Sequence, residues 1–218
     1  MANGSGISNN DFTIILDDNN LNEWQMAGKG KFVVLRREKE KGDEEEEGQS
    51  IVLQSEGGMG LLWHAKKMYG NFILKLDWKV HDKSDNSGIF VRFPYPDNDP
   101  IIAVNNGYEI QIDDLAMPDG NPIHLTGAIY GFAAPYSSSK QIPSKEVGQW
   151  NTFEIKVIDQ SYAVILNNIL ITELVGNRSL QGYIGLQNHD SRSKVSFRNI
   201  RIKEIIINKI LSNRLDNI

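Results

Sequence analysis

NSGIFVRFPYPDNDPIIAVNNGYEIQIDD, residues 86–114, contains two short apolar runs separated by a loop rich in proline and asparagine. Successive side chains of a strand point to opposite faces. In the first run this alternation predicts one face made of Ile89, Val91 and Phe93. Phe90 and Arg92 are expected on the other face. The two runs with their turn residues predict neighbouring strands of a β-sheet.

The second run, residues 108–113, separates its polar and apolar side chains completely. Its apolar face is expected to carry Tyr108, Ile110 and Ile112. The opposite face then carries Glu109, Gln111 and Asp113. Aspartate is depleted in strands in general. We therefore interpret this polar face as a candidate functional site.

Similar runs continue outward in both directions and predict an all-β chain. Residues 72–80 alternate as a half-buried antiparallel strand does, with Phe72, Leu74, Leu76 and Trp78 on the apolar side. Paired runs predict hairpins at 31–37 with 50–55 and at 162–166 with 169–173. About a dozen short strands with no long helix indicate a β-sandwich of two antiparallel sheets.

The sequence also predicts where the sandwich begins and ends. Residues 1–10 are expected to be a disordered lead-in, 11–204 a single β-sandwich domain, and 205–218 a tail or short helix. The acidic segment 38–48 is interpreted as a solvated hairpin loop. Residues 61–64 are expected to form a short edge strand.

Composition excludes several classes of function. The 218 residues carry a net charge of −5 and no basic stripe, so nucleic acid is not an expected partner. No apolar run approaches the roughly 18 residues of a membrane span. The chain has no cysteine, which excludes disulfides and thiolate chemistry. It shows no signal peptide, so a cytoplasmic location is expected unless one was removed.

Three polar clusters lie on predicted strands or at their ends. They comprise Arg92 with Asn86 and Ser87; Glu109, Gln111, Asp113 and Asp114; and Gln187 with His189. Carboxylates, an arginine, amides and an imidazole suit a polyhydroxylated ligand, and they also suit proton abstraction next to a carbonyl. Simpler interpretations remain open: Arg92 and Glu109 could form a cross-strand ion pair, and His189 could cap a turn with Asp190.

Residues 109–113 faintly resemble the Glu-x-Asp-x-Glu strand of laminarinase-type retaining glycosidases. In this sequence the middle residue is Gln111 and the last is Asp113. Residues four apart on a straight strand lie about 13 Å apart. A retaining pair of carboxyl groups needs about 5–5.5 Å, so this alternative requires a bend in the strand.

A set of motifs in family order shows a more specific resemblance. The matching segments are Phe12…Trp24, YGNF at 69–72, NSGIFVR at 86–92, GYEIQIDD at 107–114, TGAIYG at 126–131, GQWN at 148–151, GYIGLQNH at 182–189 and VSFRNIRIKE at 195–204. Together they resemble the 3-keto-disaccharide (3-keto-glycoside) hydrolase domain. That resemblance implies a concanavalin A-like jelly-roll β-sandwich.

The resemblance also implies a chemistry and a set of residues. The substrate is expected to be a glycoside whose C3 hydroxyl has been oxidised to a ketone, cleaved by proton abstraction at C2, elimination and hydration. Glu109 or His189 is expected as base, with Arg92 and Gln111 as ligands of the reacting oxygen. The residues expected to bind substrate are Asn86, Ser87, Gln111, Asp113, Asp114, Tyr130 and Gln187. Asp114 matches the family motif and Asp113 departs from it, which leaves open which of the two faces the site.

A divalent metal on Glu109 and His189, with oxygen ligands from Gln111 or an aspartate, is a further possibility. Two alternatives to an enzyme stay open at this point. One is a non-catalytic, lectin-like sugar-binding module on the same sandwich, and the other is a structural domain whose polar face contacts a partner. The sequence does not determine the oligomeric state.

Overall fold

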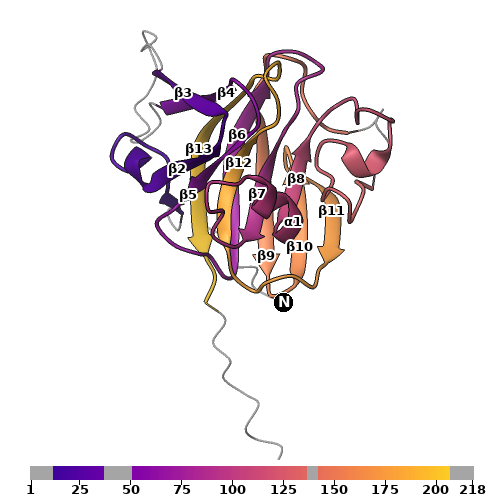
Figure 1. Cartoon of the computed structure of the whole chain (residues 1–218). Helices are drawn as coiled ribbons and strands as arrows, with labels where there is room; N and C mark the ends of the chain where they lie inside the picture. The colour runs from indigo at the N-terminus through magenta and orange to yellow at the C-terminus, as the bar shows by residue number, and fades with distance from the viewer. Residues whose placement is uncertain (1–11, 37–50, 137–141, 207–218) are drawn as a thin grey trace, which may run out of the picture.

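The computed structural model describes residues 12–36, 51–136 and 142–206, and in these residues thirteen strands form two antiparallel sheets (Figure 1). The predicted fold class, an all-β sandwich of two antiparallel sheets, is confirmed. The predicted lead-in 1–10, the predicted loop 38–48 and all but the first two residues of the predicted tail or short helix 205–218 lie outside the described residues.

The larger sheet has eight strands in the order β11-β10-β9-β6-β13-β4-β3, with β1 pairing to β13. Its strands are β1 (Thr13–Ile14), β3 (Lys31–Arg36), β4 (Ile51–Glu56), β6 (Phe72–Val80), β9 (Asn151–Ile158), β10 (Ser161–Leu166), β11 (Ile169–Val175) and β13 (Val195–Glu204). Both predicted hairpins are present, as β3–β4 and β10–β11. The turn between β10 and β11 is made by Asn167 and Asn168, whose φ angles of 50° and 69° suit a tight hairpin.

The smaller sheet has five strands in the order β2-β5-β12-β7-β8. These are β2 (Trp24–Gly28), β5 (Gly60–His64), β12 (Tyr183–Asn188), β7 (Ser87–Phe93) and β8 (Tyr108–Ile112). The described helices are short: η2 (Leu21–Glu23), α1 (Ile101–Asn106) and η3 (Pro122–His124). None of them is long and apolar enough to cross a membrane.

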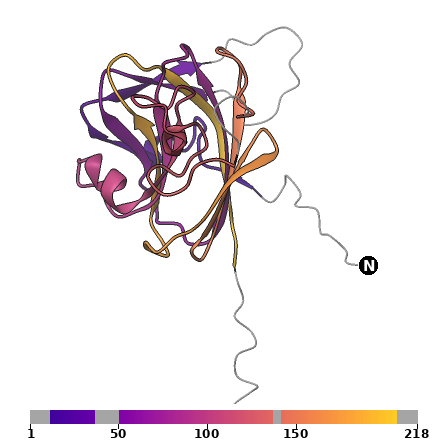
Figure 2. The same cartoon turned by 90° about the vertical axis from the view of Figure 1, so that its right-hand side faces the viewer.

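The main core lies between the two sheets. Side chains of β6 that were predicted to point inward, including Phe72 and Trp78, meet Ile110 and Ile112 of β8 in one buried cluster. A second cluster lies on the outer face of the smaller sheet, where Phe90 and Trp63 pack with Ala103 of α1. Figure 2 shows α1 on the side of the smaller sheet that faces away from the larger one. The helix therefore covers part of that outer face.

The predicted alternation in β7 is wrong beyond Val91. Arg92 has a φ of 63°, and the pairing of β7 with β12 shifts register between Ile184–Val91 and Tyr183–Phe93. This irregularity gives β7 one extra residue, as a β-bulge does. As a result, Phe93 joins Phe90 in the outer cluster instead of joining Ile89 and Val91 in the main core.

The prediction of an edge strand at 61–64 is also wrong. β5 lies between β2 and β12 and is hydrogen-bonded on both sides. The edge position belongs to β2, whose residues 24–28 were not predicted as a strand. The all-buried pattern of β5 fits its central position.

Candidate functional site

The polar side chains of β8 meet a glycine of β7 and a glutamine of β12 on the outer face of the smaller sheet. Gln111 is paired with Gly88, and Glu109 with Phe90. Leu186 is paired with Ile89, so the next step of that ladder brings Gln187 beside Gly88. Gly88 has no side chain, and an added Cβ would collide with Glu109 Oε1 and lie 2.7 Å from its Cγ. Glu109 therefore lies directly over the backbone of β7.

Three buried side-chain oxygens in this group have no hydrogen-bond partner. They are Glu109 Oε1, Gln111 Oε1 and Gln187 Oε1. The three side chains are 7%, 3% and 7% exposed, respectively. Buried polar atoms are nearly always hydrogen-bonded. Three unpaired acceptors at one position on a sheet therefore indicate a place that is completed by hydrogen-bond donors from a ligand or from water.

Burial has a large effect on the carboxyl group of Glu109. Loss of contact with water raises the pKa of Glu109 to about 8, against a smaller opposing effect of a hydrogen bond with Gln187. At neutral pH the group is therefore mostly the uncharged acid. A neutral carboxyl group can donate a proton or a hydrogen bond to an oxygen atom of a ligand.

Asn86 and Asp113 extend the polar group toward the ends of the strands. Gln111 Nε2 donates to Asn86 Oδ1 (3.3 Å), and Asn86 Nδ2 donates to Asp113 Oδ2 (3.1 Å). Asp113 also accepts from the backbone N–H groups of Leu115 and Met117, at 2.9 and 2.8 Å. Burial raises the pKa of Asp113, and these backbone bonds oppose the rise. Asp113 thus holds Asn86, which in turn holds Gln111.

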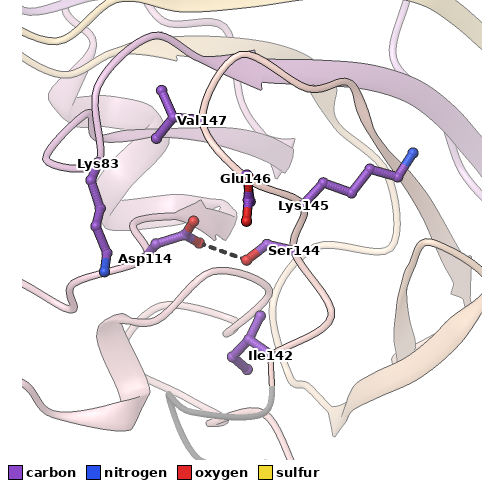
Figure 3. A pocket seen from close by; sticks show the side chains of 7 residues that line it. All are labelled: Lys83, Asp114, Ile142, Ser144, Lys145, Glu146 and Val147. Atoms are coloured by element: carbon purple, nitrogen blue, oxygen red, sulfur yellow. Dashed lines mark hydrogen bonds between the residues drawn. The ribbon is translucent and has the colours of Figure 1, made fainter.

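Asp114 points to a different place from Asp113. Its Oδ1 atom accepts from Thr126 Oγ1 at 2.6 Å and from Ser144 Oγ at 3.2 Å. It lines a separate pocket with Lys83, Ile142 and residues 144–147 (Figure 3). Of the two aspartates left open by the sequence, Asp113 is therefore the one connected to Gln111.

Two predicted site residues do not join the polar group. Ser87 is fully buried, and its hydroxyl donates to the backbone oxygen of Gln187 at 2.6 Å. Arg92 is also fully buried, and its guanidinium bonds with Ser179 O at 3.1 Å, Asp159 O at 3.4 Å and Asn71 Oδ1 at 3.5 Å. The left-handed backbone at Arg92 separates it from Glu109, so the two do not form the cross-strand ion pair considered above.

His189 lies just beyond the end of β12, so the expectation that it continues the face of Gln187 is not met. Its Nδ1 atom is 2.9 Å from Asp190 Oδ2, which is the turn contact considered as the simpler interpretation. Within the described residues, no three His, Asp or Glu side chains are grouped so as to hold a metal ion. Glu109 and His189 are thus not gathered with a third such ligand.

Tyr130 lies beside Glu109. The Tyr130 N–H donates to Glu109 O at 2.9 Å, and the preceding residue, Ile129, pairs with Ile110. Tyr130 is 40% exposed and stacks on the ring of His124. The sequence reasoning missed His124 and the role of Gly88. A histidine in a turn and a glycine in a strand carry no signal until the register of the strands is known.

The chain is similar to a family of carbohydrate-active domains and to several solved structures. The family described as a 3-keto-alpha-glucoside-1,2-lyase-like domain matches residues 11–203. A proposed glycosyl hydrolase from Parabacteroides distasonis ATCC 8503 is 30% identical, with a TM-score of 0.60, over 71% of this chain and 87% of its own. A second one from that organism is 20% identical, with a TM-score of 0.65, over 92% of this chain and 99% of its own.

The carbohydrate binding module CBM66 from Bacillus subtilis shares the fold. It is 14% identical, with a TM-score of 0.55, and covers 84% of this chain and 96% of its own. No curated protein matches the sequence. The family match together with the hydrolase-named neighbours supports a carbohydrate-related function for the chain.

Proposed function

The chain belongs to the 3-keto-alpha-glucoside-1,2-lyase-like family, and from that premise we propose that it cleaves glycosides whose C3 hydroxyl has been oxidised to a ketone. The proposed site is the outer face of β12, β7 and β8. Glu109, Gln111 and Gln187 contact the sugar there, and Asn86 and Asp113 hold Gln111 in place.

The observation that carries this proposal is the set of three unpaired, buried acceptor oxygens on one face. A sugar ring presents several hydroxyl groups, and each hydroxyl can donate one hydrogen bond. Gln111 Oε1 and Gln187 Oε1 then accept from sugar hydroxyls. An unpaired buried acceptor costs about 1–3 kcal/mol, so filling such positions favours a hydroxyl-rich ligand over an apolar one.

A ketone at C3 makes the neighbouring C2 proton acidic, and removal of that proton allows the substituent at C1 to leave. Addition of water to the resulting double bond completes a net hydrolysis. The departing oxygen needs a proton. Glu109, whose pKa is raised to about 8 by burial, holds one at neutral pH and is proposed to donate it.

The test compares four substrates: the nitrophenyl and methyl 3-keto-glucosides and their two unoxidised parents. The wild-type chain is expected to cleave only the keto substrates. Glu109→Gln, which has nearly the same shape but no acidic proton, is expected to lose about 100-fold or more in turnover of the methyl substrate. It is expected to lose much less with the nitrophenyl substrate, since nitrophenolate leaves without a proton.

Glu173→Gln is the matched control, because Glu173 is an exposed residue of β11 that bonds to Tyr136. It is expected to leave turnover unchanged. Equal losses on both keto substrates in Glu109→Gln would contradict the assignment of Glu109 as the acid. Cleavage of the parent sugars at the same rate would instead indicate an ordinary glycosidase.

A sugar-binding module is the second candidate function, and one observation favours it. Tyr130, whose backbone bonds to Glu109, is 40% exposed, and an exposed aromatic ring can stack on a sugar without any chemistry. Binding of unoxidised sugars without cleavage of any of the four substrates would favour this candidate.

A further inference from the structure

His124 ends the short helix η3 and is fixed by two contacts. Its Nδ1 atom is 3.0 Å from Asp119 Oδ1. Its ring stacks on Tyr130, with centroids 4.9 Å apart and planes inclined by 23°. The imidazole side chain is 18% exposed. Asp119 thus orients the ring from its edge and Tyr130 orients it from its face.

The contact with Asp119 also determines which ring nitrogen is available. A carboxylate next to Nδ1 favours the tautomer that carries its hydrogen on Nδ1, and in the neutral form of that tautomer Nε2 has the free electron pair. Backbone bonding from Asn121 and, to a smaller extent, the contact with His124 lower the pKa of Asp119, so it is ionised at neutral pH. Within the part of the chain that the structure describes, Nε2 has no hydrogen-bond partner.

Tyr130 connects His124 to the polar side chains of β8. Ile129 and Ile110 are paired, and both lie in the core between the sheets. Tyr130 begins the turn that follows Ile129, and its backbone N–H donates to Glu109 O. This bond, the ring contact of Tyr130 with His124 and the contact of His124 with Asp119 link Glu109, Tyr130, His124 and Asp119 in that order.

Among the four histidines of the chain, His124 is the one whose ring contacts Tyr130. His64 is fully buried and bonded to Tyr69 and Glu23. His81 bonds to Gln54 and Ser196 of the larger sheet. His189 pairs with Asp190 beyond the end of β12.

We propose that His124, oriented by Asp119, is the group that removes the C2 proton of the keto-sugar, an inference that rests on the proposed function. The Nε2 atom takes the proton. The C2–H electron pair forms the C2–C3 double bond of an enolate, with the negative charge on the C3 oxygen. As the C3 carbonyl re-forms, the pair moves to make a C1–C2 double bond, and the bond from C1 to the leaving oxygen breaks.

The remaining proton transfers balance the reaction. The leaving oxygen takes the proton of the Glu109 carboxyl group. When water then adds to C1, Glu109 takes a proton from that water. The imidazolium of His124 exchanges its Nε2 proton with solvent between the two steps and then protonates C2, so the new C2 hydrogen comes from solvent. Asp119 stabilises the imidazolium between these two steps and is a positioning residue. Glu109, which holds a proton, and His124, which accepts one, are thus connected through Tyr130.

The test uses a 3-keto-sugar that has hydrogen in place of the leaving group at C1, so that proton removal at C2 cannot lead to elimination. Deuterium uptake at C2 in D₂O is followed by proton NMR, which separates C2 from C4, the other carbon next to the ketone. We expect His124→Gln to slow the uptake by 100-fold or more at an unchanged melting temperature. In His124→Ala, added imidazole is expected to restore part of the uptake. Asp119→Asn is expected to lower kcat for exchange about tenfold and to change KM little.

Replacing two other histidines by glutamine provides the control and tests a competing assignment of the base. His81→Gln, on the larger sheet, is expected to exchange at the wild-type rate. A wild-type rate in folded His124→Gln, or a loss of exchange only in His189→Gln, would overturn this inference and leave the proposed function standing. If the wild-type chain neither exchanges C2 nor cleaves a keto-glycoside, the proposed function itself has failed.

Discussion

Glu109 is a carboxyl group that a strand holds almost out of contact with water. Such a group is usually destabilising, because its ionised form is disfavoured by burial. Strong perturbation of this kind is common at functional sites. In this chain the perturbed group lies on the same face as Gln111 and Gln187, the two other side chains of the site with unpaired buried oxygens.

The perturbation of Glu109 predicts how stability depends on pH. The folded group ionises at about 8 and an ordinary glutamate at 4.5. Between these values the unfolded chain releases a proton that the folded chain keeps, so the free energy of unfolding falls as the pH rises. The slope from this one group is at most about 1.4 kcal/mol per pH unit. Glu109→Gln removes this contribution.

Chemical denaturation of both proteins at pH 5, 6, 7 and 8 checks the prediction. The wild-type free energy of unfolding, measured relative to that of Glu109→Gln, is expected to decrease steadily over this range. Parallel curves for the two proteins would show that Glu109 ionises normally in the folded chain.

At the residue scale, the sequence predicted the polar face of β8 but not all of its neighbours. Alternation alone placed Glu109, Gln111 and Asp113 together, because β8 is a regular strand. The same rule failed at Arg92, since a single residue in the left-handed region reverses the order of faces. Nothing in the residue type reveals such a bulge.

At the scale of elements, the site depends on the close approach of β7 and β8 at Gly88. Gly88→Ala introduces a methyl group that collides with the Glu109 carboxyl group. Because the end of a glutamate side chain can move, we expect a folded protein whose turnover of a methyl 3-keto-glucoside falls about tenfold or more. Gly70→Ala is the control, since its nearest atom would be Leu180 O at 3.9 Å. Equal activity of the two variants would show that the position of Glu109 is unimportant.

Arg92 belongs to the same scale, because it connects the bulge of β7 to other segments through Ser179 O, Asp159 O and Asn71 Oδ1. Arg92→Met removes all three hydrogen bonds of this fully buried guanidinium. We expect the free energy of unfolding to fall by about 2–4 kcal/mol, whereas turnover per folded molecule stays near the wild-type value. The exposed Arg192→Met is the control and is expected to change stability by less than about 0.5 kcal/mol. A stable but inactive Arg92→Met variant would instead indicate that Arg92 acts on the substrate, as the family resemblance implied.

At the scale of the whole molecule, the sequence predicted the two-sheet sandwich because nearly every strand carries its own alternating pattern. It could not predict which strand lies at an edge. β2, which was not predicted as a strand, takes the edge position expected of β5, because strand order depends on pairing between distant segments. For the same reason, strand alternation alone could not bring Glu109, Gln187 and Tyr130 together, and only the family resemblance named them as residues of one site.

The central claim is that cleavage proceeds through removal of the C2 proton. Its most direct test is cleavage of a methyl 3-keto-glucoside by the wild-type chain in D₂O, with the released sugar examined at early times against an enzyme-free control. The account predicts that each newly released sugar carries deuterium at C2. Release of the aglycone with hydrogen retained at C2 would contradict it and would indicate direct displacement at C1.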